Sequence, residues 1–323
     1  MNDLFGTLVF LIQQMWFFSI PLLIVALGGM FSERSGVVNI ALEGIMVVGA
    51  FCSIFFIKTM QDRMSGQSLL LLAILVAAGS GTLFSLLHAY AAINLKSNQT
   101  ISGTALNMFA PAFAIYAARM LQPNHVQQVV FTNTFRIAHV PILGDIPVLG
   151  ALFFQQTYIT TYIGFIILAA AAFALYKTRF GLRLRACGEH PQAADSVGIG
   201  VYKIRYAGVL LSGALAGLGG LVFVVPTSTT FNATVSGYGF LALAVLIFGQ
   251  WKPLRILFAA LFFGLMKTVA SAYSGIFFLK DLGIPSDIYK MVPYIATLVV
   301  LAFTSKRSQA PKASGVPYDR GGR

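Results

Sequence analysis

Charged residues, cysteines and catalytic motifs are all scarce in this sequence. Only 10% of its 323 residues are charged and 57% are hydrophobic, which excludes an ordinary soluble domain, in which about a quarter of residues carry charge. The chain has two cysteines. Cys52 falls in a hydrophobic segment and Cys187 in a basic one, so they cannot pair and no disulfide framework exists.

Signatures of enzyme chemistry are also missing. The sequence contains no GxxxxGKS/T phosphate loop and no GxSxG nucleophile turn, so this chain does not hydrolyse ATP by itself. It has no HExxH and no Cys/His metal spacing. The four histidines are scattered along the chain: His88, His125, His139 and His190. We therefore expect neither an enzyme nor a cofactor or metal ion bound to this chain.

Long hydrophobic windows are what the sequence does contain. They recur at roughly 18–25 residues, the length that crosses a ~30 Å hydrocarbon core as a helix. The fold class is therefore an all-α, polytopic membrane protein surrounded by lipid. Nine spans are predicted, and eight to ten crossings fit the hydropathy. The predicted spans are 8–30, 37–57, 68–93, 101–118, 158–176, 206–226, 237–249, 256–275 and 289–303.

The net charge of +12 is explained by the membrane and needs no nucleic-acid partner. With residues 177–205 placed inside, most of the 22 lysines and arginines lie on the cytoplasmic side, as the positive-inside rule requires. This places the N-terminus outside and the C-terminus in the cytoplasm. The transmembrane domain then covers 1–305, and the basic tail 306–323, rich in Gly, Pro and Ser, is expected to be disordered.

The segment 177–205, KTRFGLRLRACGEHPQAADSVGIGVYKIR, interrupts this apolar chain. Pro191 stands where a first helical turn tolerates proline, and Gly198 stands where a helix commonly ends. A short helix in a basic loop between two spans has the form of a part that another protein grips. On the other side, the long segment 119–157 is expected to be folded and either to receive an external partner or to cover the pore.

Two polar residues of the motif SGVVNIALEG, Asn39 and Glu43, are four positions apart and share a helix face. A carboxylate within a span is costly and should face water, the bundle interior or a partner charge. Asn39 and Glu43 are candidate residues of the solute path, and the alternative for Glu43 is a structural role. Lys267, in the span 256–275, is the candidate for an intramembrane ion pair with it.

Asn107 belongs to a second motif, NQTISGTALNMFAP, in which Gly103, Asn107 and Pro111 share one face. Its amide could contact a polar solute in the path or could join helices, and the second role is somewhat favoured. Gly213 and Gly217 have the GxxxG spacing of close helix packing.

Four segments together resemble one family of membrane permeases: ERSGVVNIALEGIMVVGAF (33–51), NQTISGTALNMFA (98–110), GLRLRACGEHPQAADSVGI (181–199) and GFLALAVLIFGQWKP (239–253). They are similar to ABC importer permeases of the branched-chain amino acid/ribose permease superfamily. Within it they most resemble the nucleoside, or simple-sugar, branch that works with a basic-membrane-protein-type binding lipoprotein.

The resemblance implies a type II ABC importer-like bundle in a bacterial inner membrane. It also implies three partners: a cytoplasmic ATPase that holds ATP and Mg, a second related permease chain, and an extracytoplasmic solute-binding lipoprotein. In this family the basic loop carries a coupling helix that sits on the ATPase. Carried over to this sequence, the coupling residues are Glu189, His190, Pro191, Ala194, Asp195 and Gly198.

Nucleosides are the first choice of solute, with a ribose-type sugar as the nearest alternative. A different class of function is a proton-coupled secondary transporter that uses Glu43 as its proton site. An intramembrane enzyme would need catalytic side chains clustered at one membrane face, and the sequence shows none.

Overall fold

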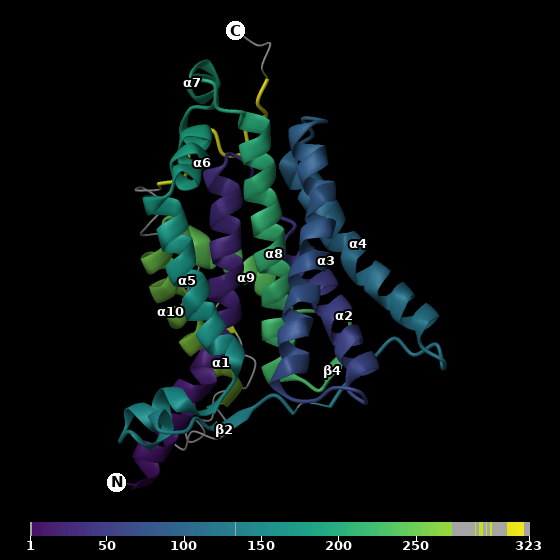
Figure 1. Cartoon of the computed structure of the whole chain (residues 1–323), viewed down its shortest axis with the longest axis vertical. Helices are drawn as coiled ribbons and strands as arrows, with labels where there is room; N and C mark the ends of the chain where they lie inside the picture. Colours follow the sequence, from purple (N-terminus) through teal and green to yellow (C-terminus); the bar gives the residue numbers. More distant parts are fainter. Residues whose placement is uncertain are drawn as a thin grey trace.

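The chain forms a bundle of long helices with a few short strands at one end, as seen in a computed structural model (Figure 1). The structure describes residues 2–132, 134–272 and 309–319, together with Ile288, Met291, Val292, Ile295 and Leu298. Within these described residues, seven helices are long and apolar enough to cross a membrane. They are α1 (Asn2–Arg34), α2 (Leu42–Met60), α3 (Gln67–Ile93), α4 (Gln99–Leu121), α5 (Ile159–Lys177), α8 (Val201–Thr227) and α10 (Pro253–Ala272).

The predicted all-α membrane fold is confirmed. Helices prevail because hydrocarbon offers no partner for backbone N–H and C=O groups, which a helix satisfies internally. Eight of the nine predicted spans coincide with helices within a few residues, and the short one at 237–249 is α9 (Tyr238–Phe248). The predicted span 289–303 lies almost wholly outside the described residues.

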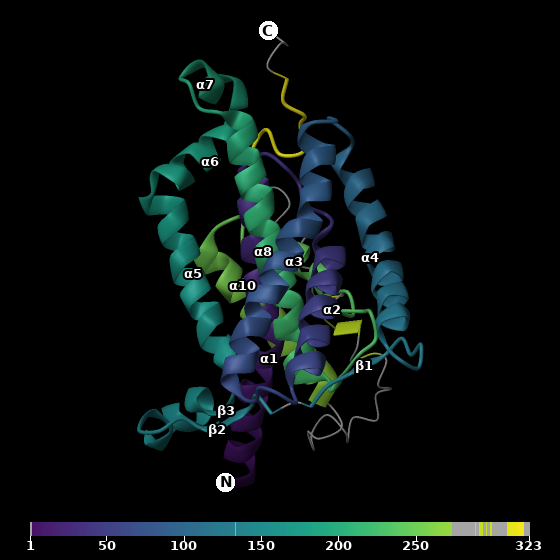
Figure 2. The ribbon, with the colours of Figure 1, turned by 45° about the vertical axis from the view of Figure 1, so that its right-hand side comes forward.

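Helix α8 forms the centre of the bundle and contacts α1, α2 and α3. Glycines permit this approach: a Cβ atom at Gly217 would overlap the carbonyl oxygen of Ala77 on α3, and one at Gly49 on α2 would overlap the backbone of Gly217. In lipid no hydrophobic force draws helices together, so such close packing holds them. Helices α4 and α5 lie on opposite sides of this centre in both views (Figures 1 and 2).

The two ends of the bundle differ. We call one the basic end; it carries α6 (Arg179–Glu189), α7 (Pro191–Ser196) and the tail 309–319 (Figure 1). The opposite end carries the N-terminus and the segment between α4 and α5. That segment holds β1 (Val129–Val130), β2 (Ile137–His139), the short helices Leu143–Asp145 and Gly150–Phe154, and β3 (Gln155–Thr157).

Antiparallel pairing ties the opposite end together. β2 pairs with β3, and β1 pairs with β4 (Thr230–Phe231), which follows α8. The Gln13 amide of α1 donates a hydrogen bond to the carbonyl of Ala151 at 2.7 Å. The segment between α4 and α5 therefore lies against α1 and the end of α8.

Two spans are discontinuous. Between α1 and α2 the chain is non-helical over 35–41, and between α8 and α9 it is non-helical over 228–237. The Asn39 amide bonds the Ser212 hydroxyl of α8 at 2.9 Å, and a Cβ atom at Gly220 would overlap the backbone of Met46. Since Ser212 and Gly220 flank the midpoint of the 27-residue α8, α2 begins near the middle of the bundle.

Candidate functional site

The predicted coupling loop folds as two short helices at the tip of the basic end. Helix α6 is capped by Thr178, whose hydroxyl oxygen accepts a hydrogen bond from the Gly181 N–H at 3.1 Å. Pro191 occupies the first turn of α7, as its fixed φ favours. Gly198 follows α7 with φ +83°, a backbone conformation that glycine adopts without strain. The chain then turns into α8.

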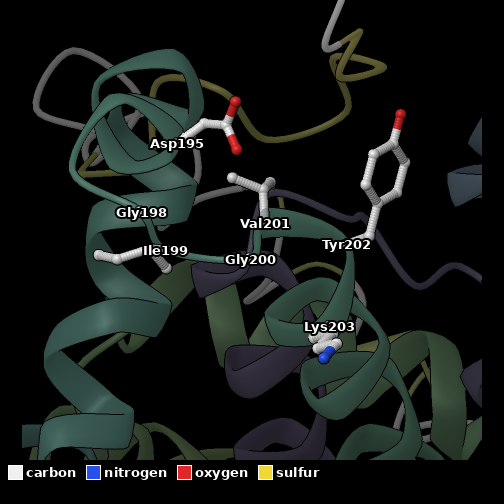
Figure 3. A pocket seen from close by; sticks show the side chains of 7 residues that line it. All are labelled: Asp195, Gly198, Ile199, Gly200, Val201, Tyr202 and Lys203. Atoms are coloured by element: carbon white, nitrogen blue, oxygen red, sulfur yellow. The ribbon is translucent and has the colours of Figure 1, made fainter.

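The exposed surface of this tip is small and mostly uncharged. Val197 is 74% exposed. Asp195 lies half-buried beside a pocket that Tyr202 and Lys203 also line (Figure 3). The other exposed residues of the tip are Glu189, His190, Gln192, Ala193, Ser196 and Gly198.

Five of the six predicted coupling residues therefore lie at or beside an exposed tip, whereas Ala194 is 4% exposed and packs with Cys187 and Val201. Ala194 anchors α7 and is not part of its outer surface. The prediction missed Gln192, Ala193, Ser196 and Val197. Helical periodicity around Pro191 could have identified these four residues, because positions three or four apart lie on one face of a helix.

Contacts behind the tip join it to the spans. The Arg34 guanidinium at the end of α1 donates a hydrogen bond to the Trp251 carbonyl at 3.1 Å and lies 3.9 Å from the Glu189 carboxylate. Gly188 lies so close to Arg34 that a Cβ atom would overlap its carbonyl oxygen. The loop thus rests directly on α1, and Arg34 links it to the turn between α9 and α10.

The tail packs under the tip, which corrects the expected disorder for residues 309–319. The guanidinium of the fully buried Arg205 donates a hydrogen bond to the Val316 carbonyl at 3.0 Å and lies 5.8 Å from the centre of the Tyr318 ring. Tyr318 is 6% exposed and belongs to the cluster of Cys187 and Ala194. Composition predicted disorder, but these contacts give the segment a fixed place.

Two titratable groups at the basic end have pKa values that this packing shifts. Asp319 forms an ion pair with Lys96 at 2.9 Å, and this hydrogen bond raises the pKa of the Lys96 ammonium. Burial raises the pKa of the Cys187 thiol to about 11. The thiol is therefore neutral and poorly nucleophilic at physiological pH.

Glu43 is held by backbone groups and not by a lysine. Its carboxylate oxygens accept hydrogen bonds from the N–H groups of Gly237 at 2.9 Å and Gly239 at 2.6 Å, at the start of α9. A helix N-terminus presents free N–H groups to a carboxylate. The predicted ion pair with Lys267 is wrong: the Lys267 ammonium lies over the Tyr238 ring, 5.9 Å from its centre.

The two asparagines proposed for the path also join elements. Asn107 donates to the Ile40 carbonyl at 2.8 Å and accepts from the Gly44 N–H at 2.7 Å, so it caps the start of α2. Asn39 is fully buried against Ser212. The structure favours the interhelical role for both side chains.

Trp251, in the turn between α9 and α10, is a buried residue of the basic end. It is 4% exposed, and its indole N–H donates to the carboxylate of Glu33 at 2.6 Å. Glu33 and Arg34 were not among the predicted site residues. The sequence around Glu33 gives no sign of its hydrogen-bond partner Trp251, which lies 218 positions away.

Comparison with known proteins places this architecture in a family. Residues 11–301 match the family described as "Branched-chain amino acid transport system / permease component". The chain belongs to that family and is a multi-pass membrane permease. No solved structure gives a significant match.

Three curated relatives extend over most of the chain. The guanosine ABC transporter permease protein NupQ of Bacillus subtilis is 43% identical over 99% of this chain and 100% of its own length. The nucleoside ABC transporter permease protein NupC of Lactococcus lactis is 43% identical over 97% and 98%. A second Lactococcus lactis nucleoside permease, NupB, is 26% identical over 93% of this chain and 83% of its own.

Proposed function

We propose that this chain is the membrane-spanning subunit of an ATP-binding cassette importer that carries nucleosides across the inner membrane. The observation that carries the proposal is the 43% identity, over nearly the full length of both chains, to permeases named for guanosine and nucleosides. ATP and Mg would be bound by a separate cytoplasmic ATPase. This chain supplies the solute path and the part that the ATPase moves.

The distribution of charge supports the orientation. Residues 177–205 carry six cations against two acids, and loops rich in Lys and Arg remain in the cytoplasm. The basic end then faces the ATPase, the tail 309–319 is cytoplasmic, and the N-terminus is outside.

The coupling mechanism follows from rigid contacts. Helix α7 offers an exposed tip, and α6 is fastened to α1 through Arg34 and Gly188. A movement of the ATPase against the tip would therefore shift α1 and α8 together as one body, because packed interfaces transmit displacement without deforming continuously.

Two further partners are part of the proposal. Lactococcus lactis has both NupB and NupC among the relatives of this chain, which supports a pair of related, non-identical permease chains. An extracytoplasmic binding lipoprotein would deliver the solute to the opposite end. There the paired strands β1 and β4 offer a folded surface.

A proton-coupled carrier receives no support from Glu43. Its two carboxylate oxygens accept hydrogen bonds from the N–H groups of Gly237 and Gly239, which supports a structural role in joining α2 to α9. A ribose-type sugar remains the alternative solute, since sugar and nucleoside share the ribose hydroxyls.

Reconstitution in proteoliposomes tests the proposal. Uptake of guanosine should require the ATPase, the second permease and the binding lipoprotein together, with ribose as the competing solute. Uptake by this chain alone, driven by a proton gradient, would refute the importer. Uptake of ribose without uptake of guanosine would refute the assignment of a nucleoside as the solute.

The ATPase contact has a separate test. Val197→Asp changes an exposed tip residue and should abolish co-purification of the ATPase, whereas Val126→Asp changes a valine that is 44% exposed at the opposite end and should not. Equal recovery of the ATPase with both variants would mean that the contact lies elsewhere.

A further inference from the structure

The segment between α8 and α9 presents a line of polar side chains. Asn232, Thr234 and Ser236 are exposed, while the alternate residues Phe231, Ala233 and Val235 are buried. The backbone bends at Ala233 and turns at Ser236, and the three polar side chains are left on its exposed side while the apolar ones are buried. We call these three residues the polar ladder.

The ladder runs from the opposite end of the bundle toward its middle. It begins directly after β4, which pairs with β1, and ends at Gly237, whose N–H binds Glu43. Glu43 lies between Asn39 and Met46, which contact α8 at Ser212 and Gly220, close to the midpoint of that helix. The ladder therefore descends through about half the thickness of the bundle.

Non-helical backbone at this depth is tolerated only against protein or a water-filled cavity. One face of the segment meets protein, because Phe231 and Val235 are at most 1% exposed. The ladder occupies the other face, which is exposed in this chain and therefore requires water or a partner chain against it. Ala233 and Ser236 also have positive φ angles of 55°, and non-glycine residues in this region are found preferentially at functional sites.

A pocket of about 240 Å³ lies along this face. Among the described residues, its lining contains hydroxyl, amide and aromatic side chains and no charged one. The lining residues are Phe223, Val224, Thr227, Ser228, Thr230, Phe231, Asn232, Thr234 and Ser236. Sites for small molecules typically measure about 300–1,000 Å³, so this pocket lies just below that range.

Part of the lining is already engaged. The hydroxyl of Thr227 donates to the Phe223 carbonyl at 2.6 Å, and that of Ser228 donates to the Thr230 carbonyl at 2.7 Å. The Thr234 hydroxyl oxygen accepts a hydrogen bond from the Ser236 N–H at 3.1 Å, which leaves its O–H free to donate. The Asn232 amide and the Ser236 hydroxyl make no hydrogen bond within the described part of the chain. These groups can both donate and accept.

We propose that the polar ladder Asn232, Thr234 and Ser236 contacts the solute on its path and binds the sugar hydroxyls of an uncharged nucleoside. The nucleoside as solute rests on the proposed function; the chemistry of the ladder does not. Neutral donors and acceptors suit hydroxyl groups, and the uncharged side chains of the described lining favour a neutral ligand.

Uptake by the complete transporter tests the ladder against a matched control. Asn232→Ala and Thr234→Val should each lower nucleoside uptake about tenfold, the effect of losing roughly 1.4 kcal/mol of solute interaction. Basal ATP hydrolysis and the amount of assembled complex should be unchanged. Thr229→Val makes the same chemical change at an exposed threonine outside the pocket and should leave uptake normal.

Removing solute hydroxyls gives a second arm. The variants should discriminate less than wild type between a nucleoside and its 2′,3′-dideoxy analogue, since the lost contact is to those hydroxyls. Unchanged uptake and discrimination in both variants, with the wild type active, would overturn the ladder. An equal loss in Thr229→Val would overturn it too.

A measurement independent of the solute separates failure of the ladder from failure of the proposed function. In a Cys52→Ser background, single cysteines at 232, 234 and 236 should react with a membrane-impermeant maleimide added from outside, and cysteines at 233 and 235 should not. Uniform or absent labelling overturns the ladder. A wild-type transporter that imports no nucleoside overturns the proposed function, and the labelling pattern then decides the ladder alone.

Discussion

Glu43 on α2 and Gly239 on α9 are joined by a hydrogen bond of 2.6 Å between a carboxylate oxygen and a backbone N–H. Each residue lies near the start of a helix that begins within the bundle. Because a helix start leaves N–H groups unsatisfied, the carboxylate of one broken span completes the other. This hydrogen bond therefore joins α2 and α9, the two helices that begin within the bundle.

Replacing Glu43 should destabilise the protein independently of Lys267. Glu43→Gln removes a charge-assisted acceptor and should cost about 1.5–3 kcal/mol of the free energy of unfolding. Lys267→Gln should leave that cost unchanged, because the two side chains form no ion pair. Thermal unfolding of the purified single and double variants measures this. A coupling energy above about 1 kcal/mol between the two substitutions would show that the two side chains do form an ion pair.

Two glycines on α3 should respond oppositely to alanine. A Cβ atom at Gly81 would overlap the carbonyl oxygen of Gly213 on α8, whereas one at Gly79 meets nothing within 4 Å. We expect Gly81→Ala to cost about 1–3 kcal/mol through overpacking and Gly79→Ala to be neutral or stabilising by up to about 1 kcal/mol. Melting temperatures in detergent test the pair, and equal shifts would contradict the α3–α8 contact.

Removing the tail should weaken the coupling loop. Truncation before Gln309 deletes Tyr318, which is buried against Ala194 and Cys187. We expect the melting temperature to fall and less ATPase to co-purify. The control truncation, after Asp319, keeps every tail contact described above. If both truncated proteins behave like the full chain, the tail does not support the tip.

Cys187 should be unreactive in the folded protein. The thiol is fully buried and its pKa is raised from 9.0 to about 11. In a Cys52→Ser background, maleimide should label the unfolded chain rapidly and the native chain hardly at all at pH 7. Rapid native labelling would show that the cluster around Cys187 opens.

The same pKa shift has a consequence for stability. The unfolded thiol loses its proton near pH 9 and the folded one near pH 11, so in this interval the unfolded state binds fewer protons. Stability from this group is therefore constant below pH 9 and falls as the pH rises toward 11, by at most about 1.4 kcal/mol per pH unit. Cys187→Ala should flatten that part of the pH profile.

The spans were predictable because hydrophobic length is a local property. The short window at 237–249 matched α9 within one residue at each end, although its being a half-length helix needed the structure. The short helix within residues 177–205 was also predictable. Pro191 at its start and Gly198 after its end act through local backbone geometry.

Partners far apart in the sequence were not predictable. The acceptor role of Glu43 depends on backbone N–H groups, which no residue pattern reports. The sequence predicted Lys267 as the partner of Glu43 from charge alone, because a sequence shows opposite charges and does not show which backbone groups are free. The tail was misjudged for a related reason: its small and polar composition is typical of disorder, whereas Tyr318 finds a cluster more than 110 positions upstream.

The position of that tyrosine also bears on how the transporter is made. The cluster that supports α7 contains Ala194, Cys187 and Tyr318, so the tip is completed only after ribosomal synthesis has passed the helices and reached the tail. A nascent or prematurely terminated chain would insert its spans and still lack a finished tip. An ATPase that recognises the finished tip would thereby assemble only with chains translated through Tyr318.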